Sequence, residues 1–201
     1  MIALIDYGAG NLTSVRKALT ALGAEFMTPG TPEELADAAG LIVPGVGHFA
    51  ATRALAGPWR DAIRAAAGRG TPLLGICVGM QWLFEGSDEA PEVPGLGVLP
   101  GRVERLRGDA ARRLKIPHVG WNALDVTPGS RLLRGLEPGP HVYFTHSYAA
   151  PVTADCVGAA THAHGFAAAV ERDNVFGVQF HPEKSSDAGL RILENFLEVT
   201  R

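Results

Sequence analysis

Short apolar segments alternate with helix-like segments in the first half of the chain, and this alternation constrains the fold more than any other feature. Strands are predicted at 1–6, 24–27, 40–43 and 73–76, with helices at about 12–22, 32–38 and 58–68 and another from 78. Short apolar strands separated by helices are typical of a parallel sheet covered on both faces. The pattern therefore predicts an α/β fold.

The second half of the chain has a different pattern, with many strands and few helices between them. Strands are predicted at 98–105, 118–126, 141–145, 155–161, 166–171 and 174–180, followed by a closing helix at about 186–199. Strands joined without crossover helices favour antiparallel pairing, so part of the sheet is expected to be antiparallel. At 201 residues, we expect residues 1–201 to form one domain.

Composition narrows the classes of function. The net charge of −3 gives no reason to expect a nucleic acid or an anionic membrane as a partner. No apolar stretch reaches the length of a membrane span, and the first residues look like a strand instead of a signal peptide. The two cysteines form no disulfide framework, which favours a reducing, cytoplasmic location. His162 and His164 alternate on a strand without further ligands, so no metal site is predicted.

A cysteine follows the strand at 73–76 and is flanked by glycines at Gly75 and Gly79. A cysteine on a strand-to-helix turn has the shape of a nucleophile elbow, with sulfur in place of a hydroxyl. Glycines tolerate a strained turn, and the helix N-terminus behind Cys77 favours the thiolate. The alternative is a buried structural cysteine.

The strand at 174–180 leads into His181, and Glu183 follows two residues later. A thiol nucleophile needs a general base, and that base needs an acceptor to fix its tautomer. The carboxyl ends of parallel strands meet at one edge of a sheet, so Cys77 and His181 can converge there. The alternative is that His181 only ends a strand and Glu183 caps the following helix.

These two motifs together resemble the class I (triad) glutamine amidotransferases, with Cys77, His181 and Glu183 as the catalytic residues. Further segments at 5–12, 44–49, 117–122 and 143–148 are similar to one branch of the family, the glutaminase subunits of imidazole glycerol phosphate synthase. The resemblance covers essentially the whole chain. It implies a flavodoxin-like three-layer sandwich with a central, mostly parallel sheet and an added antiparallel portion, and no cofactor.

An oxyanion hole is expected from two segments. Thiolate attack on an amide builds negative charge on the carbonyl oxygen, which fixed donors must stabilise. The N–H of Val78, just after the nucleophile, is one candidate. The resemblance implies that Gly45, Val46 and Gly47 complete the hole, although that segment could also be a plain strand-ending turn.

Four residues are expected at the substrate. By resemblance, Gln81 and Glu89 read the amino-acid moiety of glutamine, and the backbone around Ser147 and Tyr148 takes its carboxylate. An ammonium group favours a nearby acidic residue, which is consistent with Glu89. Glu89 could otherwise be a solvated loop charge.

The resemblance also implies a partner, because nothing in the chain binds an ammonia acceptor recognisably. The implied partner is a (β/α)₈-barrel cyclase that uses the ammonia in histidine biosynthesis, bound as a heterodimer. Asn11, Trp121, Tyr143 and Lys184 are expected to face it. Tryptophan and tyrosine commonly anchor interfaces, but Trp121 and Tyr143 could equally be core residues, and Lys184 could be a solvated lysine beside a helix.

Two other functions stay open. The glutaminase subunit of pyridoxal phosphate synthase has a similar length and triad, although the segment 117–122 argues against it. A redox-sensing or non-catalytic thiol protein on the same fold is the second, and it is disfavoured because His181 and Glu183 are both present.

Overall fold

The computed structural model describes residues 1–111 and 113–201, and its centre is an eight-stranded sheet. The strand order is β2 (Phe26–Met27), β1 (Ile2–Leu4), β3 (Gly40–Gly45), β4 (Leu73–Cys77), β13 (Val175–Val178), β12 (His164–Arg172), β11 (Cys156–His162) and β8 (Asp125–Val126). Pairing is parallel from β2 to β13 and antiparallel from β13 to β8. The antiparallel strands are not joined by crossover helices, which antiparallel pairing does not require.

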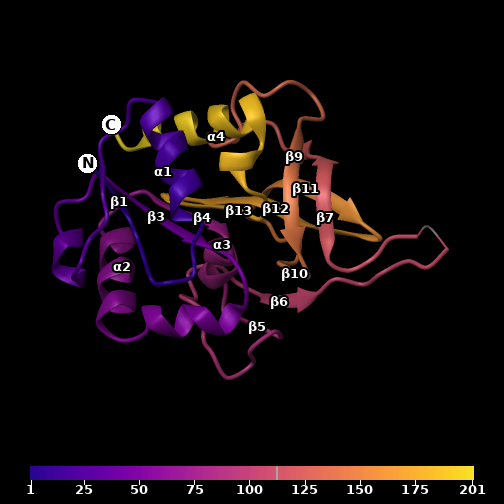
Figure 1. The fold of residues 1–201 in the computed structure, drawn as a ribbon, viewed down its shortest axis with the longest axis horizontal. Coiled ribbons are helices and arrows are strands. Elements are labelled where there is room, and N and C mark those ends of the chain that lie inside the picture. Colours follow the sequence, from indigo (N-terminus) through magenta and orange to yellow (C-terminus); the bar gives the residue numbers. More distant parts are fainter. Residues whose placement is uncertain (112) are drawn as a thin grey trace.

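Helices cover both faces of this sheet (Figure 1). Helices α1 (Leu12–Ala21) and α4 (Ser186–Val199) lie on one side, and α2 (Pro58–Gly68) and α3 (Val78–Leu83) lie on the other. Two neighbours in β13 show why: the Phe176 ring lies 5.9 Å from Phe196 of α4, whereas Gly177 faces Met80 of α3. Successive strand residues point to opposite faces. The predicted three-layer α/β fold is therefore confirmed.

Two smaller sheets flank the large one. Strand β6 (Arg102–Arg105) lies between β5 (Gly86–Ser87) and β10 (Tyr148–Ala149), and β7 (His118–Ala123) pairs antiparallel with β9 (His141–His146). The single strand predicted at 118–126 is thus split at Leu124, because β7 joins β9 while β8 extends the large sheet. The strand predicted at 98–105 starts only at Arg102, after Gly101 with a φ of 103°.

The helical predictions need two changes. The segment predicted at 32–38 forms a single 3₁₀ turn at Pro32–Leu35, and a longer 3₁₀ segment at Phe49–Leu55 was not predicted. Both are too short for the 3.6-residue periodicity on which such predictions depend. Helices α2 and α4 span the predicted residues.

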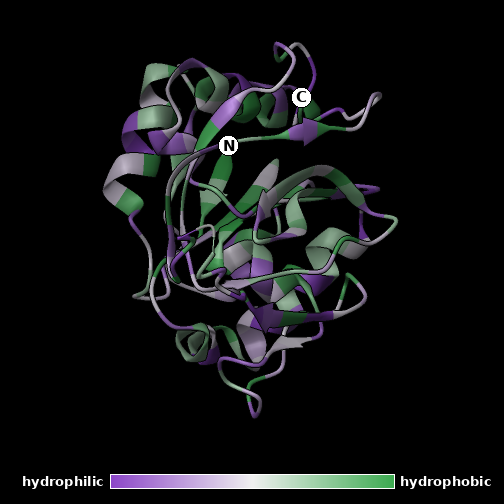
Figure 2. Cartoon of the chain, turned by 90° about the vertical axis from the view of Figure 1, so that its right-hand side faces the viewer, coloured by the Kyte–Doolittle hydropathy of each residue, from purple (hydrophilic) through white to green (hydrophobic). Residues whose placement is uncertain are grey.

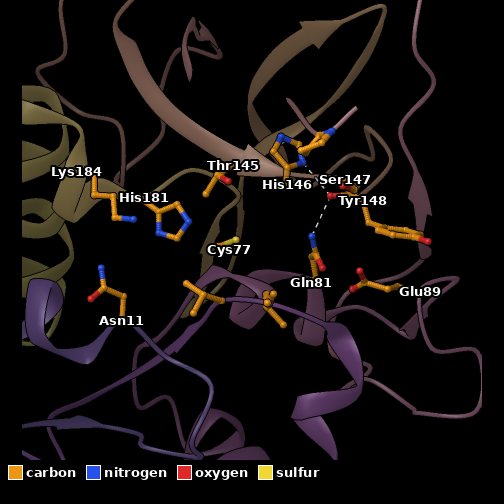
Figure 3. Close-up of a pocket in the computed structure, with 14 residues that line it drawn as sticks. Asn11, Cys77, Gln81, Glu89, Thr145, His146, Ser147, Tyr148, His181 and Lys184 are labelled. Carbon is orange, nitrogen blue, oxygen red and sulfur yellow. Dashed lines mark hydrogen bonds between the residues drawn. The ribbon is translucent and has the colours of Figure 1, made fainter. Parts of the chain in front are cut away.

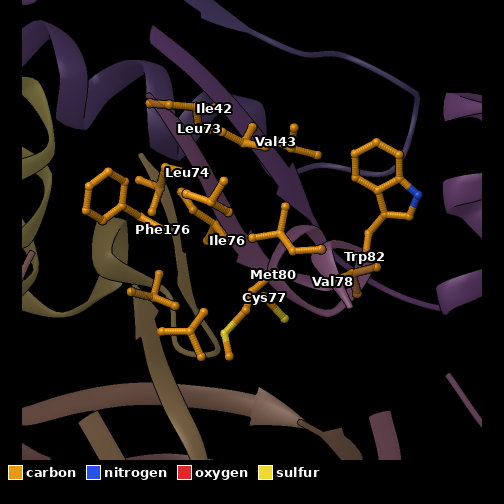
Figure 4. Close-up of a cluster of buried hydrophobic side chains, with 14 of the residues drawn as sticks. Ile42, Val43, Leu73, Leu74, Ile76, Cys77, Val78, Met80, Trp82 and Phe176 are labelled. Atoms are coloured by element: carbon orange, nitrogen blue, oxygen red, sulfur yellow. The ribbon is translucent and has the colours of Figure 1, made fainter. Parts of the chain in front are cut away.

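The hydrophobic core is concentrated on the central parallel strands. Figure 2 shows hydrophobic colours along these strands, whereas the outer helices carry both hydrophobic and hydrophilic colours. Ile42 and Val43 of β3 and Leu73 and Leu74 of β4 are all 0% exposed (Figure 4). Burying each such side chain contributes about 1.5–3 kcal/mol. Cys77 lies at the carboxyl end of this cluster, so the turn that carries the sulfur is anchored in the buried core.

Among the described residues, the helices are all too short or too polar to cross a membrane.

Candidate active site

The turn at Cys77 is sharp because three chain segments approach closely. Strand β4 ends at Cys77 and α3 begins at Val78. A Cβ on Gly75 would lie 2.6 Å from the Gly79 carbonyl oxygen, and a Cβ on Gly79 would lie 1.8 Å from that of Val43. Both glycines are therefore required by packing. Cys77 itself has a φ of 54° and a ψ of −111°, a strained conformation for a residue with a side chain.

His181 reaches the same edge of the sheet from the neighbouring strand. Strand β13 pairs in parallel with β4, with Val178 opposite Ile76, and His181 follows three residues later. Its Nδ1 lies 2.9 Å from Glu183 Oε1, and both side chains are 1% exposed. A carboxylate only accepts, so Nδ1 carries the proton and Nε2 is left for another partner. Nε2 has no hydrogen bond within the described part of the chain.

Electrostatics favours a charged imidazole at this position. Burial opposes protonation, but the proximity and charge of the Cys77 side chain, together with the hydrogen bond to Glu183 and its charge, outweigh burial and raise the pKa of His181 to about 9. A nearby negative charge stabilises the imidazolium. Near neutral pH, His181 thus carries a positive charge beside Cys77, and a cationic group next to the sulfur is the arrangement that activates a cysteine nucleophile.

A buried serine fixes the backbone of His181. Ser185 Oγ donates to the His181 carbonyl at 2.7 Å and accepts from the backbone N–H of Tyr143 at 2.9 Å. The N–H of His181 donates to the Tyr143 carbonyl, also at 2.9 Å. These bonds tie the end of β13 to β9, so the imidazole is held from two elements.

A cavity of about 440 Å³ lies in front of the sulfur (Figure 3). It is lined by residues from the carboxyl ends of the strands and the loops beyond them: Asn11, Val46, Gly47, Cys77, Val78, Gln81, Glu89, Pro117, Thr145, His146, Ser147, Tyr148, His181 and Lys184. Most residues that the sequence proposes for the site are in this set. Glu183, Gly45, Trp121 and Tyr143 are not; Glu183 lies behind His181.

One donor that the sequence leads us to expect in the segment at 45–47 is engaged elsewhere. The N–H of Val46 donates to the Ala9 carbonyl at 2.7 Å, so in this conformation it is not available to an oxyanion. Gly45 is a glycine for steric reasons, since a Cβ there would lie 2.3 Å from the Tyr7 hydroxyl. Gly47, with a φ of 90°, lines the cavity. Of the expected donors, Val78 lies directly after the sulfur at the start of α3.

The proposed substrate residues have partners within the protein. Gln81 Nε2 donates to the Tyr148 carbonyl at 2.9 Å, and Gln81 Oε1 is buried without a partner in the described residues. Glu89 Oε2 accepts from the N–H of Phe49 at 2.7 Å, so this carboxylate stabilises the start of the 3₁₀ segment as well as lining the cavity. Ser147 and Tyr148 line the cavity opposite Cys77 (Figure 3).

Three of the four proposed interface residues lie together on the surface. Trp121 is 52% exposed, and its ring meets that of Tyr143 edge-to-face at 6.1 Å. Lys184 Nζ lies 5.9 Å from the centre of the Tyr143 ring. Lys184 also lines the cavity, as does Asn11 (Figure 3). Trp121 is thus an exposed residue, and Tyr143 is half-buried beside it.

Sequence reasoning missed several residues near the sulfur. Thr145 and His146 of β9 line the cavity, and Gln179 Nε2 lies 3.7 Å from Cys77 Sγ. The sequence could have singled out Gln179 as a candidate site residue, because it is a polar residue in the otherwise apolar end of the strand predicted at 174–180. The described residues include no group of three or more His, Cys, Asp or Glu side chains arranged to hold a metal ion.

Comparison with known proteins gives the class of the chain. The family model "Glutamine amidotransferase class-I" matches residues 3–199, so the chain belongs to the class-I glutamine amidotransferases. Solved structures agree at the level of the fold. A structure described as a glutamine amidotransferase superposes with a TM-score of 0.77 at 24% identity, covering 99% of this chain and 98% of that one. The structure of PurLQS from Thermotoga maritima gives 0.75 at 22%, covering 100% and 98%.

Relatives with curated names point to a narrower class than the family model does. Three of them share one name, imidazole glycerol phosphate synthase subunit HisH. The chain is 50% identical to that of Gloeobacter violaceus, covering 98% of this chain and 88% of the relative. It is 48% identical to that of Salinibacter ruber, covering 98% and 93%. It is 47% identical to that of Moorella thermoacetica, covering 100% and 95%.

Proposed function

We propose that this chain is the glutaminase subunit of an imidazole glycerol phosphate synthase, acting in histidine biosynthesis. The observation that carries the proposal is the convergence of Cys77 with the His181–Glu183 pair at one cavity. The full-length similarity to HisH subunits supports this subunit over the related one of pyridoxal phosphate synthase. An intact base beside the sulfur also favours an enzyme over a redox thiol protein.

The proposed chemistry is hydrolysis of the glutamine side-chain amide in two steps. The Cys77 thiolate attacks the amide carbonyl, and His181 gives its proton to the departing nitrogen, which leaves as ammonia. The product of this step is a cysteine thioester. His181 then takes a proton from water, whose oxygen attacks the thioester, and glutamate leaves as the thiol is restored.

Each residue at the cavity has a role in this scheme. Glu183 holds the His181 tautomer. The N–H of Val78 stabilises the oxyanion, with Gly47 and, after a change of conformation, Val46 as further donors. Gln81 Oε1 and Glu89 face the ammonium group of the substrate. The backbone at Ser147 and Tyr148 faces its carboxylate.

The ammonia acceptor is proposed to lie in a separate chain, a (β/α)₈-barrel cyclase that forms a heterodimer with this one. The surface of Trp121, Tyr143 and Lys184 suits such a partner, because an exposed tryptophan beside a tyrosine is a common interface anchor. Lys184 and Asn11 belong to both the cavity and its rim. Ammonia released at Cys77 would thus leave at the face that the partner covers.

The test is glutamate release from glutamine in the presence of the cyclase and its nucleotide substrate. Changing Cys77→Ala or Cys77→Ser should abolish hydrolysis while leaving binding to the cyclase intact. A matched control is Cys156→Ala, which removes the other cysteine from β11, outside the cavity. It should keep wild-type activity. If Cys77→Ala retains wild-type glutamate release, the proposed function is wrong.

A further inference from the structure

A second glutamine lies between the nucleophile and the substrate end of the cavity. Gln179 follows β13 directly and precedes His181 by two residues, and it is 0% exposed. A buried amide costs free energy unless its polar atoms are paired, so its hydrogen bonds indicate what it does. The scheme above gives it no role.

The hydrogen bonds of Gln179 have only one possible direction. Gln81 Nε2 donates to the Tyr148 carbonyl at 2.9 Å (Figure 3), and a carbonyl can only accept. Gln81 therefore presents the same NH₂ group to Gln179 Oε1, at 3.1 Å. Because Gln179 has its oxygen on Gln81, its own NH₂ group faces Cys77 Sγ, at 3.7 Å. The Tyr148 carbonyl on β10 thus sets the orientation of both amide groups, and the NH₂ group of Gln179 donates to the sulfur of Cys77.

We propose that Gln179 is a catalytic residue that donates a hydrogen bond to the Cys77 thiolate and holds the sulfur in line with the bound substrate. This inference rests on the proposed glutaminase function and adds to it. Donors to a charged acceptor stabilise the charged form. The same bonds turn Gln81 Oε1 away from Gln179, toward the side of Glu89, where the substrate ammonium is proposed to bind (Figure 3).

The other groups near the sulfur cannot replace this donor. His181 faces it from the end of β13, with Glu183 behind, but His181 must release its proton during the reaction. Tyr7 is close enough for its charge to interact with that of Cys77, and burial together with that interaction raises the pKa of its hydroxyl. Among the described residues the Tyr7 hydroxyl has no hydrogen-bond partner, whereas Gln179 donates to Sγ and has no proton to release in the reaction. It can therefore stay on the sulfur throughout the cycle.

The test measures the pH dependence of Cys77 alkylation by iodoacetamide in a Cys156→Ala background, where Cys77 is the single thiol. Gln179→Met keeps the length of the side chain but removes the donor, and Gln179→Glu replaces the donor with an anion. The pH midpoint of alkylation should rise in both, by about one unit or more in Gln179→Glu, since a hydrogen bond to a charged group contributes ~1.5–3 kcal/mol. Glutamine kcat should fall about tenfold or more in both.

A third variant and a thermal unfolding measurement separate a role at the sulfur from misfolding. Gln81→Met changes α3 and leaves Gln179 in place but free to rotate, so it should raise the midpoint by less than Gln179→Met. A purely structural role would lower the thermal unfolding midpoint and leave the alkylation midpoint unchanged. Unchanged alkylation midpoints in folded Gln179→Met and Gln179→Glu would overturn the proposal.

Alkylation requires no glutamine turnover, so the two proposals fail separately. If the wild-type protein releases no glutamate in the presence of its cyclase, the proposed function is wrong. The alkylation comparison would still report whether Gln179 acts on the sulfur.

Discussion

At the scale of single residues, His181 and Glu183 are expected to contribute unequally. Changing His181→Ala should slow glutamate release by ~10²-fold or more, the usual cost of losing a positioned general base. Glu183→Gln should cost less, because this residue orients the imidazole and transfers no proton. The measurement is glutamate release at saturating cyclase. Glu194→Gln, which changes a partly exposed carboxylate paired with Arg191 on α4, is the matched control and should keep wild-type activity. Equal rates in all three variants would remove the pair from the mechanism.

Single residues also show how far the sequence can be interpreted. Cys77 and His181 could be predicted because each follows an apolar strand, and parallel strands end at one edge of the sheet. Gln179 could not be given a role, because its partners Cys77 and Gln81 are 102 and 98 positions away. The hydrogen bond from the Val46 N–H to the Ala9 carbonyl could not be predicted either. A segment with glycines on both sides of Val46 can turn this peptide group toward the cavity or away from it.

At the scale of secondary structure, the pairing of β7 with β9 places two buried histidines, His118 and His146, opposite each other. His146 Nδ1 lies 2.9 Å from the Tyr148 carbonyl, and His146 Nε2 lies 3.0 Å from His118 Nδ1. The carbonyl only accepts, so each imidazole donates from Nδ1 and both can remain uncharged. Burial lowers the pKa of His118 to about 4 and that of His146 to about 3.

The sign of the resulting pH effect follows from linkage. Below the ordinary pKa of 6.5, the unfolded histidines bind protons that the folded ones do not, so the free energy of unfolding falls as the pH drops from 6.5 toward 4. His118→Gln should flatten this decline, measured by urea unfolding between pH 7 and pH 5. His141→Gln, at an exposed position on β9, is the control for replacing a histidine on these strands. Identical slopes for His118→Gln and the wild type would contradict the assignment.

The same strands mark the limit of element-level prediction. The sequence at 118–126 has strand propensity throughout, so it predicts one strand. The break at Leu124 arises because β7 and β8 pair with different partners, β9 and β11, both later in the chain. Propensity reports that a segment is extended but not which segment it pairs with.

At the scale of the whole molecule, the free chain is expected to be a poor glutaminase until its partner binds. The N–H of Val46 is hydrogen-bonded to the Ala9 carbonyl, so the proposed oxyanion hole lacks this donor in the free chain. Losing one oxyanion donor costs ~10²–10³ in kcat. Glutamate release should therefore rise by about that factor when the cyclase and its nucleotide substrate are added. Three measurements decide this: free chain, chain with cyclase, and chain with both. Full activity of the free chain would refute it.

The backbone at Cys77 has a consequence for evolution as well as for chemistry. A side chain at a φ of 54° costs about 1–3 kcal/mol that a glycine would not incur. Folding alone would thus favour a glycine at this turn, which lies in the buried core. The position trades stability for reactivity, so only selection for the reaction keeps a cysteine where the fold would accept glycine more readily.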